Sequence, residues 1–196
     1  NFPDGLIVQG KYQTKPPLPF APGSEAAGVV ADIGEGVTGF KRGDRVVAFS
    51  GTGGFAEQVV VPATQVYHAP EGVSFEALAG LLINYGTSYH ALKDRAAMKP
   101  GETLLVLGAA GGVGLSAVEL GHLMGAKVIA AASSAEKLQL AKSRGATELI
   151  DYTTENLRDR IKEITNGKGV DVVYDPVGGD STLATIKSLA WGGRHL

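Results

Sequence analysis

The sequence predicts an α/β protein: a doubly wound parallel sheet preceded by a smaller β-rich segment. Two observations support this fold class. From residue 103 onward, apolar runs of strand length alternate with helical patterns, and the links between them are short. A glycine-rich turn, "GAAGGVG" at residues 108–114, joins the first of those runs to the first of those helices. Alternation of this kind is typical of a parallel sheet with helices on both faces.

The composition limits the classes of function. The chain has 196 residues, 44% of them hydrophobic, so it can bury a substantial core. A net charge of −2 offers no field that would attract nucleic acid or an anionic membrane surface, and we expect neither partner. There is no cysteine, which excludes disulfides, thiol catalysis and thiolate zinc ligands within these residues. We find no secretory signal and no apolar run of bilayer length, and we expect a cytoplasmic protein.

Residues 1–84 are predicted to form a β-rich domain. The stretch "KYQTKPPLPFAPG" is rich in proline and predicts an extended loop. The short β-rich runs that follow are separated by glycine, proline and aspartate, which predicts a compact antiparallel barrel or sandwich. We expect its strands at residues 26–33, 45–49, 55–61 and 65–68.

A helical pattern crosses the boundary between the two predicted domains, 1–84 and 85–196. It begins at Ser74 and continues to about Ala97. Gly86, within "NYGTSY", is expected to interrupt this helix, and the Pro100-Gly101 pair is expected to end it.

Residues 85–196 are predicted to form the parallel sheet and its helices. Ser134 is placed to cap the second helix, and Gly145 to end it. We expect strands at residues 103–108, 126–132, 147–152 and 169–179, the last with its exit loop, and helices at 112–124, 134–144, 156–165 and 181–191. The last six residues, "WGGRHL", are expected to enter a further strand. Since the chain starts at Asn1 rather than Met and stops in that stretch, both ends look cut.

The glycine-rich turn is the strongest functional motif. It follows a strand and opens a helix, which is the context that dinucleotide binding requires, although its spacing is G-x-x-G-G-x-G rather than G-x-G-x-x-G. Small residues there let a pyrophosphate approach main-chain N–H groups at the positive end of the helix. A glycine-rich turn without a ligand remains the alternative, and no Lys-Ser or Lys-Thr pair follows that would indicate a P-loop. The candidate cofactor-binding residues are Gly108, Ala110, Gly111, Gly112, Val113 and Gly114.

The end of the second strand predicts NADPH rather than NADH. NAD-binding domains usually carry a carboxylate there, which binds the ribose hydroxyls and would repel a 2′-phosphate. Here Ser133 and Ser134 stand in its place, and Lys137 follows, a combination that suits a phosphate. Alternatively, Ser134 is only a helix cap and Lys137 a solvated side chain. Tyr152 could contact the adenosine end, or it could be a half-buried tyrosine at the sheet edge.

These motifs together resemble a known family. The stretches "PGSEAAGVV", "GDRV", "GTSYHAL", "GETLLVLGAAGGVGLSAVEL", "EKLQLAKSRGA" and "DVVYDPVGG" occur in that order. The chain resembles the zinc-independent quinone oxidoreductases (zeta-crystallin-like proteins) of the medium-chain dehydrogenase/reductase superfamily. The resemblance implies a partial GroES-like domain beside an incomplete Rossmann-type NADP-binding domain, with the active site in the cleft between them. It also implies a homodimer of the full-length protein, formed through the Rossmann sheet.

The resemblance further implies NADPH-dependent reduction of quinones or other α,β-unsaturated carbonyl compounds. When the family's site residues are transferred to the matching motif positions, Gly111 to Gly114 hold the pyrophosphate. Lys137 and Tyr152 hold the 2′-phosphate end, and Ser133 can assist them. The remaining site residues that it implies are Thr87 near the nicotinamide, Val177 and Gly178 near the cofactor, and Asn1 and Tyr12 on the substrate side. Family members are longer at both ends, and the chain departs from their pattern at Leu6, Asn84 and Tyr85, which leaves the substrate open.

The stretch "GSE" predicts chemistry without a metal. Zinc-dependent relatives carry "GHE" there, whose histidine ligates zinc, whereas Ser24 offers a poor ligand. A conjugated acceptor is the easier substrate without a Lewis acid, because the negative charge spreads into an enolate or hydroquinone. Glu25 is expected to be structural, bound by hydrogen bonds or paired with a cation such as Arg45. The alternatives are an enoyl-thioester reductase and a non-catalytic, crystallin-like protein that binds NADPH.

Overall fold

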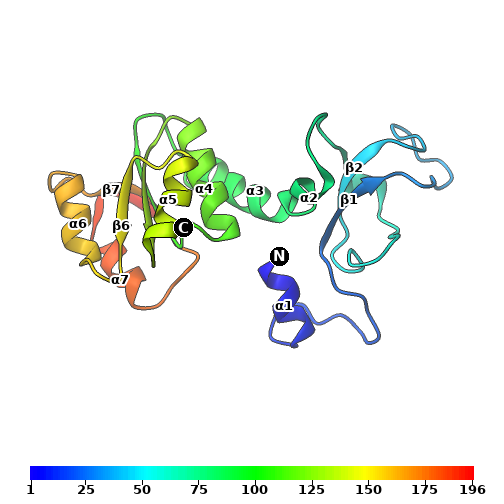
Figure 1. Cartoon of the computed structure of the whole chain (residues 1–196), viewed down its shortest axis with the longest axis horizontal. Helices are drawn as coiled ribbons and strands as arrows, with labels where there is room; N and C mark the ends of the chain where they lie inside the picture. Colours follow the sequence, from blue (N-terminus) through cyan, green and yellow to red (C-terminus); the bar gives the residue numbers. More distant parts are fainter. The chain divides into compact units, whose positions relative to one another are not determined.

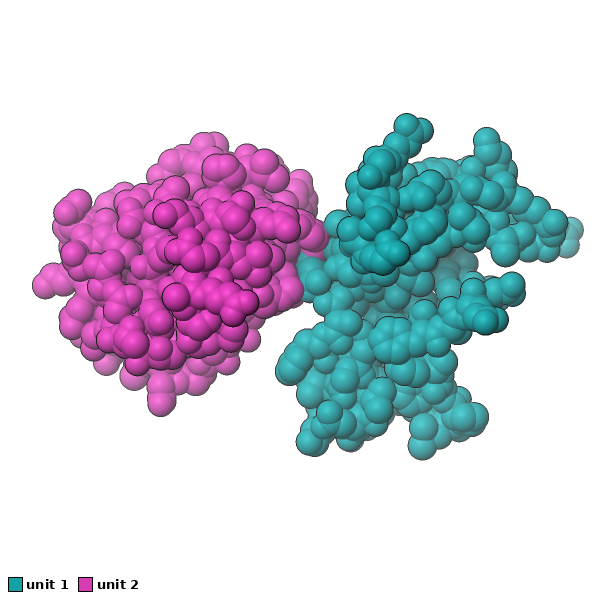
Figure 2. All heavy atoms as spheres, in the orientation of Figure 1, with its two compact units in different colours: residues 1–84 teal, residues 85–196 magenta.

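The computed structural model describes residues 1–196, which form two compact units, residues 1–84 and residues 85–196. Figure 2 colours unit 1 teal and unit 2 magenta. The first contains a small antiparallel sheet and the second a five-stranded parallel sheet flanked by helices. This arrangement confirms the predicted fold class.

Unit 1 is built on a three-stranded sheet in the order β1-β2-β3 (Figure 1). Its strands are β1 (Glu25–Val29), β2 (Arg45–Phe49) and β3 (Val66–His68). The central strand is the apolar one, and Val46, Val47 and Ala48 are all buried. β2 begins and ends where the sequence predicts, but β1 ends four residues early, and residues 55–61 form no strand. A short run rich in valine therefore does not suffice for a strand where no neighbouring strand pairs with it.

The sequence analysis missed a helix at the start of the chain. α1 (Phe2–Val8) has Asn1 as its N-cap, and Asn1 and Asp4 form a capping box. Its proline, Pro3, lies in the first turn, where the missing N–H costs no intrahelical hydrogen bond. The proline-rich stretch that follows is a loop, as predicted.

The helical region after residue 74 is broken at a different place from the one predicted. Ser74 caps α2 (Phe75–Leu78), and the break falls at Ala79 and Gly80. α3 (Leu81–Tyr89) then passes through Gly86 without interruption and continues as the π-helix η2 (His90–Arg95). A glycine inside a helix costs only about 1 kcal/mol relative to alanine, which tertiary contacts of neighbouring residues can offset.

Unit 2 contains a parallel sheet in the order β6-β5-β4-β7-β8. Its strands are β4 (Thr103–Leu107), β5 (Lys127–Ala132), β6 (Glu148–Asp151), β7 (Val170–Tyr174) and β8 (Leu189–His195). Its helices are α4 (Gly112–Leu123), α5 (Ala135–Ser143), α6 (Leu157–Ile164) and α7 (Asp180–Ile186). From β4 the chain continues to β5 and β6 on one side and later returns to β7 on the other. This reversal next to β4 is the place where open α/β sheets bind ligands.

Two apolar clusters cover the two faces of this sheet. One contains Leu104 and Val106 with residues of α4 and α5, such as Val118 and Ala141. The other packs the opposite side chains of the strands against α6 and α7. The last predicted helix is wrong at its end: α7 stops at Ile186, and Trp191 lies in β8, fully exposed.

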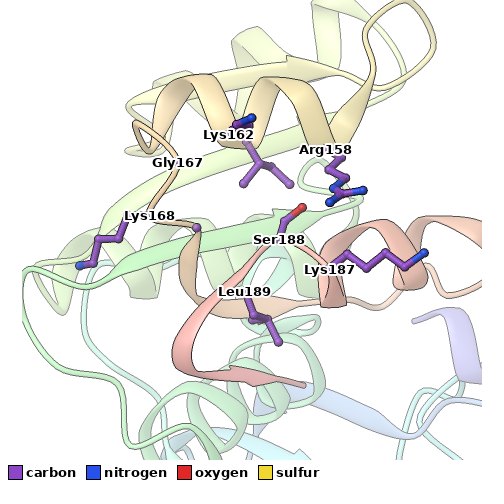
Figure 3. A pocket seen from close by; sticks show the side chains of 9 residues that line it. Arg158, Lys162, Gly167, Lys168, Lys187, Ser188 and Leu189 are labelled. Atoms are coloured by element: carbon purple, nitrogen blue, oxygen red, sulfur yellow. The ribbon is translucent and has the colours of Figure 1, made fainter.

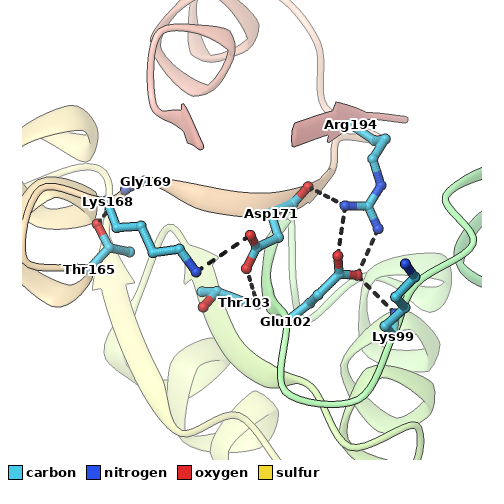
Figure 4. A network of polar contacts seen from close by, with 8 residues as sticks. All are labelled: Lys99, Glu102, Thr103, Thr165, Lys168, Gly169, Asp171 and Arg194. Carbon is cyan, nitrogen blue, oxygen red and sulfur yellow. Dashed lines mark hydrogen bonds and ion pairs between the residues drawn. The ribbon is translucent and has the colours of Figure 1, made fainter. Parts of the chain in front are cut away.

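A polar network ties the turn before β4 to β7 and β8 (Figure 4). Arg194 donates to both carboxylate oxygens of Glu102, at 2.9 and 2.7 Å, and to the carbonyl of Asp171 at 3.2 Å. The carboxylate of Asp171 accepts from the N–H of Thr103 at 2.8 Å. The hydrogen bond from Arg194 is the largest influence on Glu102 and lowers the pKa of that carboxyl. These contacts hold the three strands together away from the glycine-rich loop.

A cavity of about 230 Å³ opens between α6 and the start of β8 (Figure 3). Four cations, Arg158, Lys162, Lys168 and Lys187, are among its lining residues, and each of the three lysines has a local structural role available. Lys162 stands in the last turn of α6 and Lys187 at the C-cap of α7, where cations stabilise the helix dipole. Lys168 lies 3.8 Å from the carboxylate of Asp171.

Candidate functional site

The glycine-rich loop leaves the carboxyl end of β4 through a backbone shape that requires glycine. Gly108 has a φ of +57°, in the left-handed region. The N–H of Gly111 donates back to the carbonyl of Gly108 at 2.9 Å, which closes the turn. A Cβ on Gly114 would lie 2.2 Å from the carbonyl oxygen of Gly108, far inside contact distance. The loop and the first turn of α4 therefore approach as closely as backbones can.

The first turn of α4 presents main-chain donors. The N-cap, Gly111, has no side chain to accept a hydrogen bond, and the first intrahelical bond runs from Leu115 N–H to Gly111 at 2.7 Å. The N–H groups of Gly112, Val113 and Gly114 therefore have no acceptor within the helix. Donors of this kind at the positive end of a 12-residue helix suit an anion such as a pyrophosphate.

A second loop, "DPVGG" after β7, lies beside the first. A Cβ on Gly108 would be 3.0 Å from Cγ2 of Val177, so these two predicted site residues are in contact distance. The loop is held by Asp175, which accepts from the N–H groups of Val177 and Gly178 at 3.0 and 2.8 Å and from the hydroxyl of Thr182 at 2.5 Å. The sequence analysis did not identify Asp175. An aspartate two or three residues before the N–H groups of a turn is a signal that could have found it.

The environment of Asp175 favours its ionised form. Burial would raise the pKa of the carboxyl, but the hydrogen bonds from Thr182, Gly178 and Val177, with His195 nearby, outweigh it and lower the pKa. Nε2 of His195 lies 3.5 Å from this carboxylate. Asp175 therefore remains a hydrogen-bond acceptor for the loop over the neutral pH range.

The end of β5 carries the pair predicted to choose the dinucleotide. Nζ of Lys137 donates to the hydroxyl of Ser133 at 2.9 Å. Ser134 caps α5 by accepting from the N–H of Lys137 at 3.4 Å, so the cap role proposed for it is confirmed. Tyr152 follows β6 at the same edge of the sheet, where its N–H donates to the carbonyl of Ala132 at 3.3 Å.

Thr87 lies on α3 in unit 2, exposed, beside the buried Ser88. The loops after β4, β5, β6 and β7 lie at the carboxyl edge of the parallel sheet, and each carries predicted site residues. Asn1 and Tyr12 belong to unit 1. Tyr12 is half-buried in the loop after α1.

Unit 1 contains its own polar cluster around the two residues of "GSE". Ser24 donates to Oδ1 of Asp4 at 2.7 Å, and both are buried. The buried Glu25 accepts from the side-chain amide of Asn1 and from the N–H of Ile83 at 3.1 Å. Burial raises the pKa of Glu25, and these hydrogen bonds only partly offset it.

The predicted pairing of Glu25 with Arg45 is wrong, whereas the predicted hydrogen-bonding role of Glu25 is confirmed. Arg45 instead donates to the carbonyl of Val73 and lies over the ring of Phe75, 4.0 Å from its centroid. The guanidinium of Arg45 is therefore engaged by an aromatic ring and a carbonyl rather than a carboxylate, and its Nε is buried without a hydrogen-bond partner.

Two negative findings complete the survey of the chain. Nowhere in residues 1–196 do three or more histidine, aspartate or glutamate side chains gather closely enough to hold a metal ion. None of the helices has both the length and the apolar character needed to cross a bilayer.

Comparison with known proteins supports the resemblance. The alcohol dehydrogenase GroES-like domain matches residues 1–71, and the zinc-binding dehydrogenase family matches residues 112–196. A quinone oxidoreductase-like protein 2 homolog of Nematostella vectensis is 47% identical over 195 residues, which are 98% of this chain and 53% of that protein. The chain spans about half the length of the curated relatives it matches.

Solved structures agree with the sequence relatives. The Escherichia coli quinone oxidoreductase complexed with NADPH has a TM-score of 0.89 and 40% identity, over 96% of this chain and 58% of that one. The CurK enoyl reductase has a TM-score of 0.91 and 28% identity, over 100% of this chain and 61% of that one. The two family models, the relatives and the shared architecture give one assignment: the chain belongs to the medium-chain dehydrogenase/reductase superfamily and, as predicted, resembles its quinone oxidoreductases.

Proposed function

We propose that this chain is part of an NADPH-dependent oxidoreductase that reduces quinones or other α,β-unsaturated carbonyl compounds without zinc. The observation that carries the proposal is the carboxyl edge of the unit 2 sheet. There, a glycine-rich loop that tolerates no side chain at Gly114 stands beside the Ser133–Lys137 pair. Structures of similar quinone oxidoreductases contain NADPH, which agrees with this arrangement.

The residues present fit the dinucleotide. The free N–H groups of Gly112, Val113 and Gly114 would bind the pyrophosphate. Lys137 and Ser133 would bind the 2′-phosphate, because a cation and a hydroxyl suit it and no carboxylate stands at the end of β5 to repel it. Tyr152 would lie toward the adenosine. Gly108 and Ala110 would leave room for the phosphates, since neither carries a bulky side chain.

Bound NADPH supplies a hydride to the acceptor, and the chain contributes position. Thr87, Val177 and Gly178 would orient the nicotinamide end, the last two on a loop that Asp175 holds. Asn1 and Tyr12 are assigned to the substrate side by the family resemblance, with Tyr12 a candidate proton donor.

Independence from zinc is supported by the donor set of these residues. The hydroxyl at the position of the histidine ligand, that of Ser24, already donates to Asp4, and the chain contains no thiolate. Without a Lewis acid, an acceptor that delocalises the incoming negative charge is the substrate class that the site can reduce most easily.

The proposed cofactor preference is tested by Lys137→Ala, with dissociation constants for NADPH and NADH measured by nucleotide fluorescence. We expect NADPH to bind about tenfold more weakly and NADH to change little, because only the former carries the 2′-phosphate. Lys142→Ala is the matched control, since it removes an exposed lysine from the last turn of the same helix. Equal losses for the two nucleotides would refute the role of Lys137.

Two alternative functions remain, and one assay tests both. The likeness to an enoyl reductase structure favours an enoyl-thioester reductase. The other alternative is an NADPH-binding protein without turnover, like crystallins. NADPH oxidation measured with 1,4-benzoquinone and with a crotonyl thioester separates them: turnover of the thioester alone indicates the first, and tight binding of NADPH without turnover of either indicates the second.

We also propose that the full-length protein is a cytoplasmic homodimer, of which the family resemblance supports the dimer. Analytical ultracentrifugation of the full-length protein tests the dimer, since a monomer at micromolar concentration would contradict it. Imaging of the tagged full-length protein in cells tests its location.

A further inference from the structure

Three hydroxyl groups meet in the interior of unit 2. They come from three elements far apart in the sequence: Ser88 on α3, Ser116 on α4 and Tyr174 at the end of β7. Their side chains are almost fully buried, with exposed fractions of 0%, 2% and 5%. The hydroxyl of Ser88 lies 2.9 Å from that of Ser116 and 3.0 Å from that of Tyr174. Buried hydroxyls bonded to one another need a complete set of donors and acceptors.

The cluster ends on the carbonyl of Val113, in the first turn of α4. Ser88 lies 2.8 Å from this oxygen, and Ser116 lies 2.9 Å from it. The three hydroxyls carry three protons. If Tyr174 donates its proton to Ser88, the protons of Ser88 and Ser116 remain to be placed. Each of these can be donated to the Val113 carbonyl or to the other serine, so every proton has an acceptor. If Ser88 donated to Tyr174 instead, the buried phenol proton would have no acceptor among these groups, which is costly.

Tyr174 is suited to remain the donor. Burial raises the pKa of its phenol, and the hydrogen bond with Ser88 only partly offsets this. The phenol therefore keeps its proton over the neutral pH range. The hydroxyl of Ser88 is the centre of the cluster, because it contacts both of the other hydroxyls and the Val113 carbonyl.

The cluster connects the two ends of the proposed cofactor site. Ser88 is adjacent to Thr87, assigned to the nicotinamide side, and Val113 lies in the turn assigned to the pyrophosphate. Tyr174 is adjacent to Asp175, which holds the loop of Val177 and Gly178. All of these residues belong to unit 2.

We infer that Tyr174, Ser88 and Ser116 are positioning residues, which fix the first turn of α4 relative to α3 and so set the distance between the pyrophosphate loop and Thr87. None of the three touches the cofactor in this role. The inference rests on the proposed function for its catalytic consequence, but the fixing of the loop is a property of the chain alone.

The primary test is hydrogen–deuterium exchange of the chain without nucleotide. Tyr174→Phe removes one oxygen and leaves the ring in the core. We expect amide exchange in residues 108–118 to rise at least about fivefold, because Ser88 loses the hydrogen bond from Tyr174 that orients it toward the Val113 carbonyl. Ser88→Ala should show the same increase, and Ser88→Thr, which keeps the hydroxyl, should restore most of the protection.

Thr165→Val is the matched control for general destabilisation. It removes a part-buried hydroxyl that donates to Ile161 at 2.7 Å and accepts from Gly169 N–H at 3.0 Å, away from the glycine loop. We expect a comparable loss of thermal stability and no local change in residues 108–118. If Tyr174→Phe and Thr165→Val change exchange there equally, the positioning role is wrong.

Nucleotide binding and turnover separate this inference from the proposed function. At a temperature well below each Tm, we expect Tyr174→Phe to bind NADPH about tenfold more weakly and to lose more in kcat than in quinone KM. A wild-type chain that shows the exchange pattern but binds no NADPH would contradict the proposed function and leave the positioning of the loop established. Loss of loop protection with unchanged NADPH affinity and kcat would contradict the catalytic consequence.

Discussion

The two units of the chain hold their polar sites in different ways. In unit 2 the site is formed largely by backbone, at the ends of strands such as β4, β5 and β7, most of whose residues are buried. Unit 1 buries only five apolar side chains, Ile7, Val46, Val47, Ala48 and Leu78, and its cluster at Glu25 is held by side-chain hydrogen bonds. A site formed by main-chain groups, as in unit 2, requires small residues that leave the main chain accessible. A site formed by side chains, as in unit 1, requires the charged residues themselves.

The largest effect is expected where the backbone site has no room. Gly114→Ala would place a Cβ 2.2 Å from the Gly108 carbonyl, and neither backbone can yield without opening the turn. We expect NADPH affinity to fall at least about 100-fold, or ~2.8 kcal/mol, measured by titration calorimetry. Gly111→Ala, whose Cβ would lie 3.3 Å from the same oxygen, should lose less. A larger loss for Gly111→Ala would show that close approach is not what limits the loop.

Asp175 in unit 2 and Glu25 in unit 1 should give opposite pH dependence of stability. The pKa of Asp175 is lowered in the folded state, so its ionised form stabilises the fold above pH ~3.9, and this contribution is lost as the pH falls below that value. The pKa of Glu25 is raised, so its protonated form stabilises the fold, and that contribution is lost as the pH rises from ~4.3 through the folded-state pKa.

Urea unfolding from pH 3 to 7 checks both carboxylates. Asp175→Asn should flatten the acid limb below about pH 4, and Glu25→Gln should remove a decline in the free energy of unfolding above it. Identical profiles for the two variants would contradict the contrast between these two carboxylates.

The smallest effect concerns the helix at which the units meet in the sequence. A Cβ on Gly86 would meet nothing within 4 Å, and α3 runs through this position. Gly86→Ala should therefore raise the free energy of unfolding by about 0.5–1 kcal/mol, measured by chemical denaturation. A destabilised variant would indicate that α3 is interrupted there after all, as the sequence alone suggested.

Much of unit 2 could be predicted because its signals are local. Continuous apolar runs such as residues 103–108 are buried on both faces, and the glycine-rich turn carries its own backbone requirement. Three features depend on distant partners and could not be predicted: the hydroxyls of Ser88 and Tyr174 meet across 86 positions of sequence, α3 continues through Gly86, and residues 55–61 find no strand to pair with.

The candidate site shows the same limit. Motif spacing places the loops after the strands at one edge of the sheet, but not the side chains that fix those loops. Asp175 holds the loop of Val177, and Ser88 supports the first turn of α4. The role of Asp175 carries a local signal, its place two and three residues before the N–H groups that it binds, whereas Ser88 gains its role only from neighbours distant in the sequence.

The Ser133–Lys137 pair has a consequence for protein engineering. Lys137 is exposed and Ser133 only half-buried, whereas the strand before them is buried to its last residue, and Arg194 braces the sheet elsewhere. Exchanging the pair therefore places little demand on folding. If the pair selects the dinucleotide as proposed, cofactor preference could be changed by substitutions there while the sheet beneath stays unchanged.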